Sequence, residues 1–122
     1  MLTRRLTAMY RPAHMKVPFA NSSDPVTSGS LIGYLFASLD TLEKVLGAPG
    51  PGGDKTTFEW MVSFSPPGRA PFLLNIYDWK WPLNDRTAEY EWHIGGDPRE
   101  KDERSFMFKT AGDSLGLKVS DY

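Results

Sequence analysis

The sequence has no cysteine among its 122 residues. This absence excludes disulfide bonds, thiolate nucleophiles and cysteine-ligated zinc, and it fits a reducing intracellular environment. Long apolar runs are missing too, since no stretch approaches the ~18 residues that a membrane span needs. We therefore expect a soluble protein that does not cross a membrane.

The chain also lacks an excess of charge of either sign, because 14 Lys and Arg residues stand against 15 Asp and Glu residues, for a net charge of −1. This balance excludes a strong overall attraction to nucleic acid or to a membrane surface, although local patches survive the averaging. The apolar content of 40% and the charged content of 24% are ordinary for a soluble globular protein. At this length we expect one compact domain with a single core.

The charge is nevertheless divided unevenly along the chain. Residues 1–27 contain four basic side chains and one acidic side chain, a balance of +3, which leaves −4 for residues 28–122. Apolar residues at helical spacing precede Pro12 and allow a short amphipathic turn, and the Pro- and Ser-rich stretch that follows is typical of an unstructured connector. We predict a basic N-terminal arm over 1–27 and a compact domain over 28–122.

Three interpretations of the arm stay open. It can be a mobile solvated tail, because short N-terminal segments often fray. It can become ordered by docking on a partner or on a second copy, with its basic side chains paired to carboxylates or phosphates, nucleic acid included. It also resembles a mitochondrial targeting peptide in composition, because its first 23 residues contain arginine and serine but no acidic residue.

The compact domain is expected to begin with a strand and a helix. Residues 30–37 are rich in β-forming side chains, and Gly33 within them marks a possible bulge. Ser38 is suited to cap a helix whose apolar side chains share one face and which Gly47 ends. The APGPGGD stretch that follows is a turn, and it lacks the Gly-Lys-Ser/Thr ending of a phosphate-binding loop.

Three tryptophan-containing blocks then predict three strands, over residues 55–64, 71–79 and 88–94. In the first and third, alternation separates an apolar face from a polar face. The middle block is partly apolar on both faces, with Tyr77 and Trp79 on the second face, so it is expected to be a central strand. The side chains assigned to the core by this alternation are Phe58, Trp60, Val62, Phe64, Phe72, Leu74, Ile76, Tyr90, Trp92 and Ile94.

A second helix is expected near the end of the chain. Gly95 and Gly96 open it, Asp97 serves as its N-cap and Pro98 occupies its first position, and Gly112 ends it after about Ala111. The predicted order is therefore β-α-β-β-β-α. We predict an α+β fold, a two-layer sandwich in which two helices cover one face of a four-stranded antiparallel meander.

The blocks GDKTTFEW, NIYDWK and YEWHIGG, preceded by a strand and the short LEKVLGAPG helix, carry a resemblance over about residues 28–97. Their combination resembles a family of small uncharacterised proteins of bacteriophages, especially those of actinobacterial hosts. The resemblance brings no catalytic or binding residue with it. The long N-terminal arm and the SPPGRAP turn depart from the family pattern. The resemblance implies a viral origin, a place in the host cytoplasm or in the virion, and a host-directed binding protein.

Two polar groupings can be considered as sites. His93, the only histidine after residue 27, shares the predicted outer face with Glu59 and Glu91, which can orient an imidazole for acid–base work. A surface histidine hydrogen-bonded across strands explains the same pattern, and no nucleophile accompanies it, so we expect no enzyme, no metal and no cofactor. The predicted helix start offers a second site, where N–H groups of Gly95 and Gly96 and the Arg99 side chain can receive an anion.

The aromatic residues favour a third role, as an interface. Trp, Tyr and Arg are the side chains that most often anchor protein interfaces. The expected partner-binding surface consists of Tyr77, Asp78, Trp79, Lys80, Trp81 and Arg86, although Asp78 can equally bond a neighbouring backbone N–H. The acidic residues around it disfavour nucleic acid there.

We expect a non-enzymatic binding protein of bacteriophage type that contacts a macromolecular partner, for example as an inhibitor of host defence. One alternative is a virion-associated or structural assembly protein that reaches a neighbouring subunit with its arm, which includes a possible oligomer. The other alternative is a protein that sequesters a nucleotide or another small molecule, which the ligand would stabilise against heat.

Overall fold

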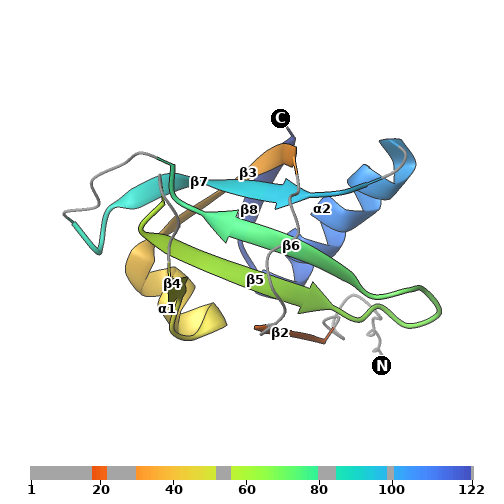
Figure 1. Cartoon of the computed structure of the whole chain (residues 1–122), viewed down its shortest axis with the longest axis horizontal. Helices are drawn as coiled ribbons and strands as arrows, with labels where there is room; N and C mark the ends of the chain where they lie inside the picture. The colour runs from red at the N-terminus through yellow and green to blue at the C-terminus, as the bar shows by residue number, and fades with distance from the viewer. Residues whose placement is uncertain (1–17, 22–29, 52–55, 80–84, 99–100, 122) are drawn as a thin grey trace, which may run out of the picture.

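The computed structural model describes residues 18–21, 30–51, 56–79, 85–98 and 101–121. Two helices and seven strands form in these ranges (Figure 1). In chain order they are β2 (Phe19–Asn21), β3 (Ser30–Ser38), α1 (Leu39–Leu46), β4 (Gly50–Pro51), β5 (Phe58–Phe64), β6 (Phe72–Tyr77), β7 (Glu89–Gly96), α2 (Lys101–Leu115) and β8 (Lys118–Asp121).

All described strands belong to one antiparallel sheet in the order β2-β5-β6-β7-β3-β8. The short strand β4 pairs with β5 and is not part of this linear order. The predicted α+β class is confirmed, and β6 is central as expected. The sheet is larger than the predicted four strands. The three additional strands β2, β4 and β8 have two to four residues each, and alternation over so few residues gives no usable signal.

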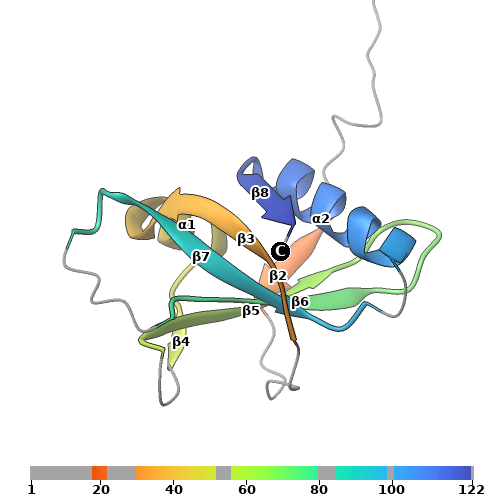
Figure 2. The same cartoon turned by 90° about the horizontal axis from the view of Figure 1, so that it is seen from above.

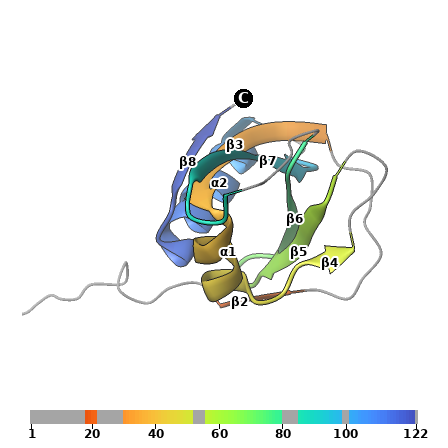
Figure 3. The ribbon, with the colours of Figure 1, turned by 90° about the vertical axis from the view of Figure 1, so that its left-hand side faces the viewer.

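The sheet is strongly curved, and both helices lie on its concave side (Figure 3). Helices α1 and α2 lie toward opposite ends of the sheet (Figure 2). One continuous core fills the space between the two layers, with contributions from both helices and from β3, β5, β6 and β7. The opposite, convex side of the sheet is called the outer face below.

Trp60 and Trp92 hold helix α1 against the sheet. Their rings meet edge to face, 5.5 Å apart between centroids at 73°. The Nε1 of Trp92 donates to the carbonyl of Ala37, just before α1, and the Nε1 of Trp60 donates to the carbonyl of Gly47, just after it, each at 2.9 Å. Both rings are buried, so the prediction that these two tryptophans belong to the core is confirmed.

The ends of α1 are also as expected. The Thr41 backbone N–H donates to the Ser38 side-chain oxygen at 3.1 Å, the capping bond that a helix N-terminus needs. Gly47 takes a φ of 90°, which suits glycine, and its N–H donates to the Glu43 carbonyl. The expected bulge at Gly33 is confirmed as well, since the register between β3 and β7 shifts between Leu31 and Gly33.

Both predicted ends of the second helix are wrong. Gly95 and Gly96 are the last residues of β7, and α2 begins at Lys101, so Asp97 is not its N-cap and Pro98 is not its first residue. The helix also continues through Gly112 to Leu115. It ends instead at Gly116, which has a φ of 70° and whose N–H donates to the Gly112 carbonyl at 2.9 Å.

Part of the predicted N-terminal arm belongs to the sheet. Phe19–Asn21, expected within a connector, pair with the end of β5, and the ring of Phe19 lies 6.0 Å from that of Phe64. Residues 1–17 and 22–29, which include the predicted amphipathic turn and all of the arm's charges, lie outside the described residues. In the ranges that the structure describes, no helix is long and apolar enough to cross a membrane.

Candidate functional site

Four rings meet on the outer face of the sheet. Tyr34 on β3 and Tyr77 on β6 are the cross-strand neighbours of His93 on β7, one on each side. Each tyrosine ring stands edge-on to the imidazole at 5.4 Å, and Trp79 stacks on it at 6.2 Å and 18°. Tyr77 and Trp79 also meet edge to face at 6.3 Å. Tyr34, Tyr77, Trp79 and His93 are called the outer aromatic cluster below.

The cluster is open to solvent at Trp79. Trp79 is 40% exposed, and it is the one exposed large apolar residue in the part of the chain that the structure describes. Tyr34, Tyr77 and His93 are half-buried. The prediction that Trp79 lies outside the core is confirmed, because the alternation of β6 sends Leu74 and Ile76 inward and Tyr77 outward.

Packing in the cluster shifts the pKa values of His93 and Tyr77. Partial burial lowers the pKa of His93, and the nearby Glu91 carboxylate opposes this effect. Partial burial likewise raises the pKa of Tyr77, and the charge of Glu59 and the neighbouring Tyr34 add to the increase. Both shifts favour neutral rings near neutral pH, so the cluster presents uncharged aromatic surface.

The expected acid–base arrangement of Glu59, Glu91 and His93 is not assembled. Within the described ranges neither carboxylate hydrogen-bonds His93, whose neighbours are rings instead. Glu59 accepts a hydrogen bond from the Asn75 amide at 2.9 Å and another from the Thr56 hydroxyl at 3.4 Å. The same ranges contain no group of three or more His, Asp or Glu side chains that could hold a metal.

The other residues of the expected interface divide into three groups. Asp78 is 3% exposed, and its Oδ1 accepts the backbone N–H groups of Thr57 and Phe58 at 2.8 and 3.0 Å, so the alternative of a backbone-bonding carboxylate is confirmed. Arg86 pairs with Asp40 at 2.8 Å and also with Glu43, both on helix α1 on the concave side. Lys80 and Trp81 lie outside the described residues.

The expected anion site depended on a helix start that is not there. Gly95 and Gly96 lie in β7, opposite Leu31 and Ser30 of β3, and Gly95 also faces Asn75 of β6. Because these glycines are strand residues, they do not offer the set of unpaired backbone N–H groups found at a helix N-terminus. Arg99 lies outside the described residues.

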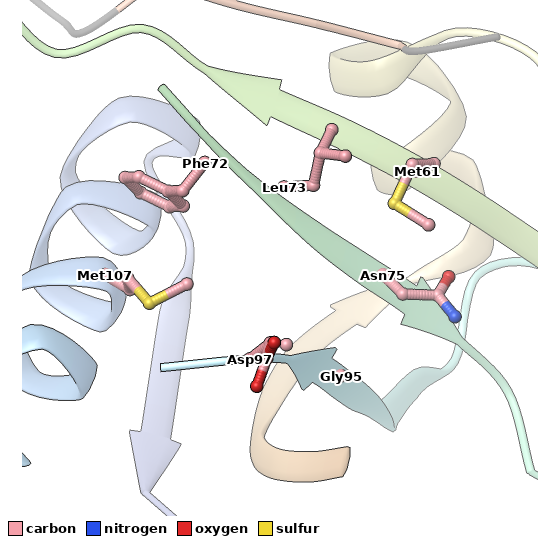
Figure 4. A pocket seen from close by; sticks show the side chains of 8 residues that line it. Met61, Phe72, Leu73, Asn75, Gly95, Asp97 and Met107 are labelled. Carbon is pink, nitrogen blue, oxygen red and sulfur yellow. The ribbon is translucent and has the colours of Figure 1, made fainter. Parts of the chain in front are cut away.

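A small hollow of about 140 Å³ lies beside β6 and the end of β7 (Figure 4). It is lined by Met61, Phe72, Leu73, Asn75, Gly95, Gly96, Asp97 and Met107. A Cβ added at Gly95 would lie 3.4 Å from the Tyr77 ring and 3.6 Å from the Cβ of Asn75, so the hollow adjoins the outer aromatic cluster at Gly95.

Sequence reasoning missed Tyr34 and Asn75. Alternation in residues 30–37 indicates that Tyr34 and Phe36 share a face, but only the pairing of β3 with β7 brings Tyr34 to His93. Asn75 gave no signal, because a single amide within a strand is ordinary.

No protein-family model, no curated protein and no solved structure matches this chain.

Proposed function

We propose that this chain is a non-enzymatic binding protein that contacts a macromolecular partner, in the first place another protein, through the outer face of its sheet. The observation that carries the proposal is the exposed Trp79 ring, stacked on His93 in a cluster of four rings. Both helices lie on the opposite face, so no described helix covers this surface.

The packing of the cluster supports the proposal energetically. Large aromatic side chains anchor interfaces because each buries much apolar area and has few rotatable bonds. Trp79 already contacts Tyr77 and His93, which restrict its ring before a partner arrives. On binding, Trp79 therefore loses less conformational entropy than a ring without such neighbours would lose, and this reduces the entropic cost of association.

The charges near the cluster favour protein over nucleic acid as the partner. Glu59 lies beside Tyr77 across β5 and β6, and Glu91 precedes His93 by two residues on β7. Both carboxylates would repel a phosphate backbone, which contributes much of the affinity in nucleic-acid complexes. A protein partner with basic groups at this surface meets no such penalty.

The resemblance to actinobacteriophage proteins motivates the finer form of the proposal, a host-directed inhibitor that acts in the host cytoplasm. Affinity capture from an actinobacterial lysate tests it with three baits, namely the wild-type chain, Trp79→Ala and Phe106→Ala. Phe106 is a partly buried aromatic residue on α2, which covers the other face, so its replacement is a matched control.

We expect the wild type and Phe106→Ala to capture the same protein, and Trp79→Ala to lose at least about tenfold in affinity, as truncation of an interface anchor does. Far-UV circular dichroism of Trp79→Ala should match the wild type. Equal capture by Trp79→Ala contradicts the proposal, and an unfolded Trp79→Ala would assign this ring to the fold instead. A chain lacking residues 1–17 keeps the partner under this proposal and loses it if the arm makes the attachment.

A further inference from the structure

The hollow beside the outer aromatic cluster exists because two neighbouring strands separate. The ladder between β6 and β7 spans only Asn75–Tyr77 on the β6 side, and β7 ends at Gly96. The first half of β6 therefore has β5 on one side and, in the described part of the chain, no strand on the other. In Figure 4, Met61, Leu73 and Asn75 surround this opening from the sheet, with Met107 toward α2 and Asp97 at the end of β7.

Most of the wall of the hollow is apolar and adaptable. Met61, Leu73, Phe72 and Met107 line it, and methionine side chains adjust their shape more readily than branched ones. A cavity of about 150 Å³ is large enough to hold benzene. A hollow of about 140 Å³ therefore has room for one large side chain.

Asn75 contributes an unpaired hydrogen-bond acceptor to the wall of the hollow. The Nδ2 of Asn75 donates to Glu59 Oε2 at 2.9 Å. Because a carboxylate only accepts, this bond fixes the orientation of the amide, and the Oδ1 of Asn75 is left buried without a partner. An unsatisfied buried acceptor is unfavourable, so a donor that reaches it gains the full value of the hydrogen bond.

Asp97 adds a negative charge at the rim of the hollow. Its side chain is exposed, and within the described residues it has no hydrogen-bond or ion-pair partner. Glu59, which holds Asn75, supplies a second carboxylate nearby. No described side chain that lines the hollow carries a positive charge, so the hollow is suited to a cation.

We propose that the hollow receives an arginine side chain of the protein partner, a step that rests on the function proposed above. The aliphatic stem packs against Met61 and Met107, and the guanidinium donates to the Asp97 carboxylate and to Asn75 Oδ1. Arginine fits better than lysine because its planar fork of donors reaches two separate acceptors at once. Since Asn75 Oδ1 has almost no exposed surface, the methionine walls move slightly as the side chain enters.

The position of the hollow links it to the proposed interface. Gly95 has no side chain, and a Cβ added to Gly95 would lie 3.4 Å from the nearest atom of the Tyr77 ring. A partner that covers Trp79 and Tyr77 therefore extends directly over the mouth of the hollow. The aromatic cluster supplies the broad apolar contact, and the hollow selects a basic residue next to it.

Titration of the folded full-length chain with acetyl-arginine-amide, followed by amide NMR shifts, tests this proposal without any partner. We expect saturable shifts centred on Gly95, Gly96 and Asp97, with a Kd on the order of 1 mM for a ligand of this size. Acetyl-citrulline-amide, which has nearly the same shape but no charge, should bind at least about fivefold more weakly.

Three variants locate the site. Asp97→Asn removes the rim charge and should weaken binding about fivefold or more, as loss of a charge-assisted contact does. Gly95→Val places a β-branched side chain at the mouth and should abolish binding. Asp113→Asn removes an equivalent charge on α2, where it pairs only with Lys109 at the surface, and should leave the Kd unchanged.

The results separate this proposal from the proposed function. Shifts centred on Tyr34 and His93, equal binding of the citrulline analogue, or no saturable binding would each overturn the arginine site. Partner capture that depends on Trp79 but is unchanged in both Asp97→Asn and Gly95→Val would overturn it while the proposed function stands. Binding of the arginine probe without capture of any partner would contradict the proposed function alone.

Discussion

At the scale of single residues, Asp78 shows how an acidic side chain next to a tryptophan can serve the fold. Its Oδ1 accepts the N–H groups of Thr57 and Phe58, and its own N–H donates to the Phe58 carbonyl at 3.3 Å. These bonds join the end of β6 to the start of β5. The next residue is the exposed Trp79, so these bonds anchor the backbone from which that ring extends.

Replacing Asp78 with alanine is expected to lower the free energy of unfolding by about 2–4 kcal/mol, because two N–H donors at the start of β5 lose their acceptor. Urea titration followed by circular dichroism measures the change. Asp113→Ala, which removes an exposed carboxylate, should change stability by less than about 1 kcal/mol. A similarly small effect for Asp78→Ala would show that water satisfies these donors.

His93 makes stability depend on pH in a defined direction. Partial burial among Tyr34, Tyr77 and Trp79 lowers its pKa in the folded state, with Glu91 opposing. The unfolded chain therefore takes up the proton first as the pH falls through the ordinary histidine pKa of about 6.5. Stability should fall on acidification across this range and stop responding to His93 below the folded pKa.

The measurement is the difference in urea midpoint between roughly pH 7.5 and pH 5.5. The wild type should lose more stability over this interval than His93→Gln, which cannot titrate. His14→Gln removes the other histidine of the chain and serves as the control, with a pH dependence like that of the wild type. A larger loss in His93→Gln than in the wild type would reverse the expected sign.

The sequence separates the tryptophans correctly because each fits a two-residue period within its own strand. Trp60 and Trp92 fall in phase with buried neighbours such as Val62 and Ile94, whereas Trp79 does not. Local alternation decides which face a side chain occupies, so this part of the site was predictable. The partners of each ring across strands were not, since they depend on register.

At the scale of elements, Gly33 explains how α2 approaches the sheet so closely. A Cβ at this position would lie 2.3 Å from the Phe108 ring and 2.5 Å from the Ser120 carbonyl oxygen. The bulge between Leu31 and Gly33 turns this bare backbone toward the helix. The contact therefore joins β3, β8 and α2 at one point.

Gly33→Ala is expected to destabilise the protein by about 1–3 kcal/mol or more, because the backbone oxygen cannot move aside as a side chain can. Gly50→Ala is the matched control in β4, where the added Cβ meets only the Glu59 carbonyl oxygen at 3.5 Å, an ordinary contact. Thermal unfolding of both variants measures the difference. Equal melting temperatures would mean that the bulge relaxes to admit a methyl group.

The boundaries of α2 show where local signals fail. The sequence GGDPRE combines a glycine pair, a cap residue and a proline, each of which is typical of a helix start. Pairing of Gly95 and Gly96 with β3 outweighs that local preference and extends the strand. Gly112 lies inside the helix, where a Cβ would lie 3.2 Å from Val119. Its glycine therefore reflects the close approach of β8, a strand that the sequence did not predict, and not the end of the helix.

At the scale of the whole molecule, the two-layer architecture follows from the pattern of elements, but the order of strands does not. Short turns join β5 to β6, and the predicted meander is confirmed there. The first long strand, β3, lies beside β7 at the far end of the meander instead of beside β5. That non-local pairing places Tyr34 next to His93, so a site residue was hidden by topology.

A single continuous core also predicts that the two ends of the molecule unfold together. Leu42 of α1 and Phe108 of α2 belong to the same buried cluster, and small domains with one core usually unfold in a single step. The indole N–H bonds of Trp60 and Trp92 make their fluorescence a probe of the α1 end. Of the two described helices, α2 contributes most of the helical signal in far-UV circular dichroism, because it has 15 residues against eight in α1.

In a Trp79→Phe/Trp81→Phe variant, which keeps only the two core tryptophans, urea unfolding followed by the two signals should therefore give coincident curves. Their common slope should be about 1–3 kcal/mol per molar urea, the range for small single domains. Separate midpoints would mean that α1 and α2 are stabilised by independent parts of the core. Coincidence would mean that any ligand that binds only the native state stabilises both ends of the molecule, because every element that unfolds in the same step shares the gain in stability.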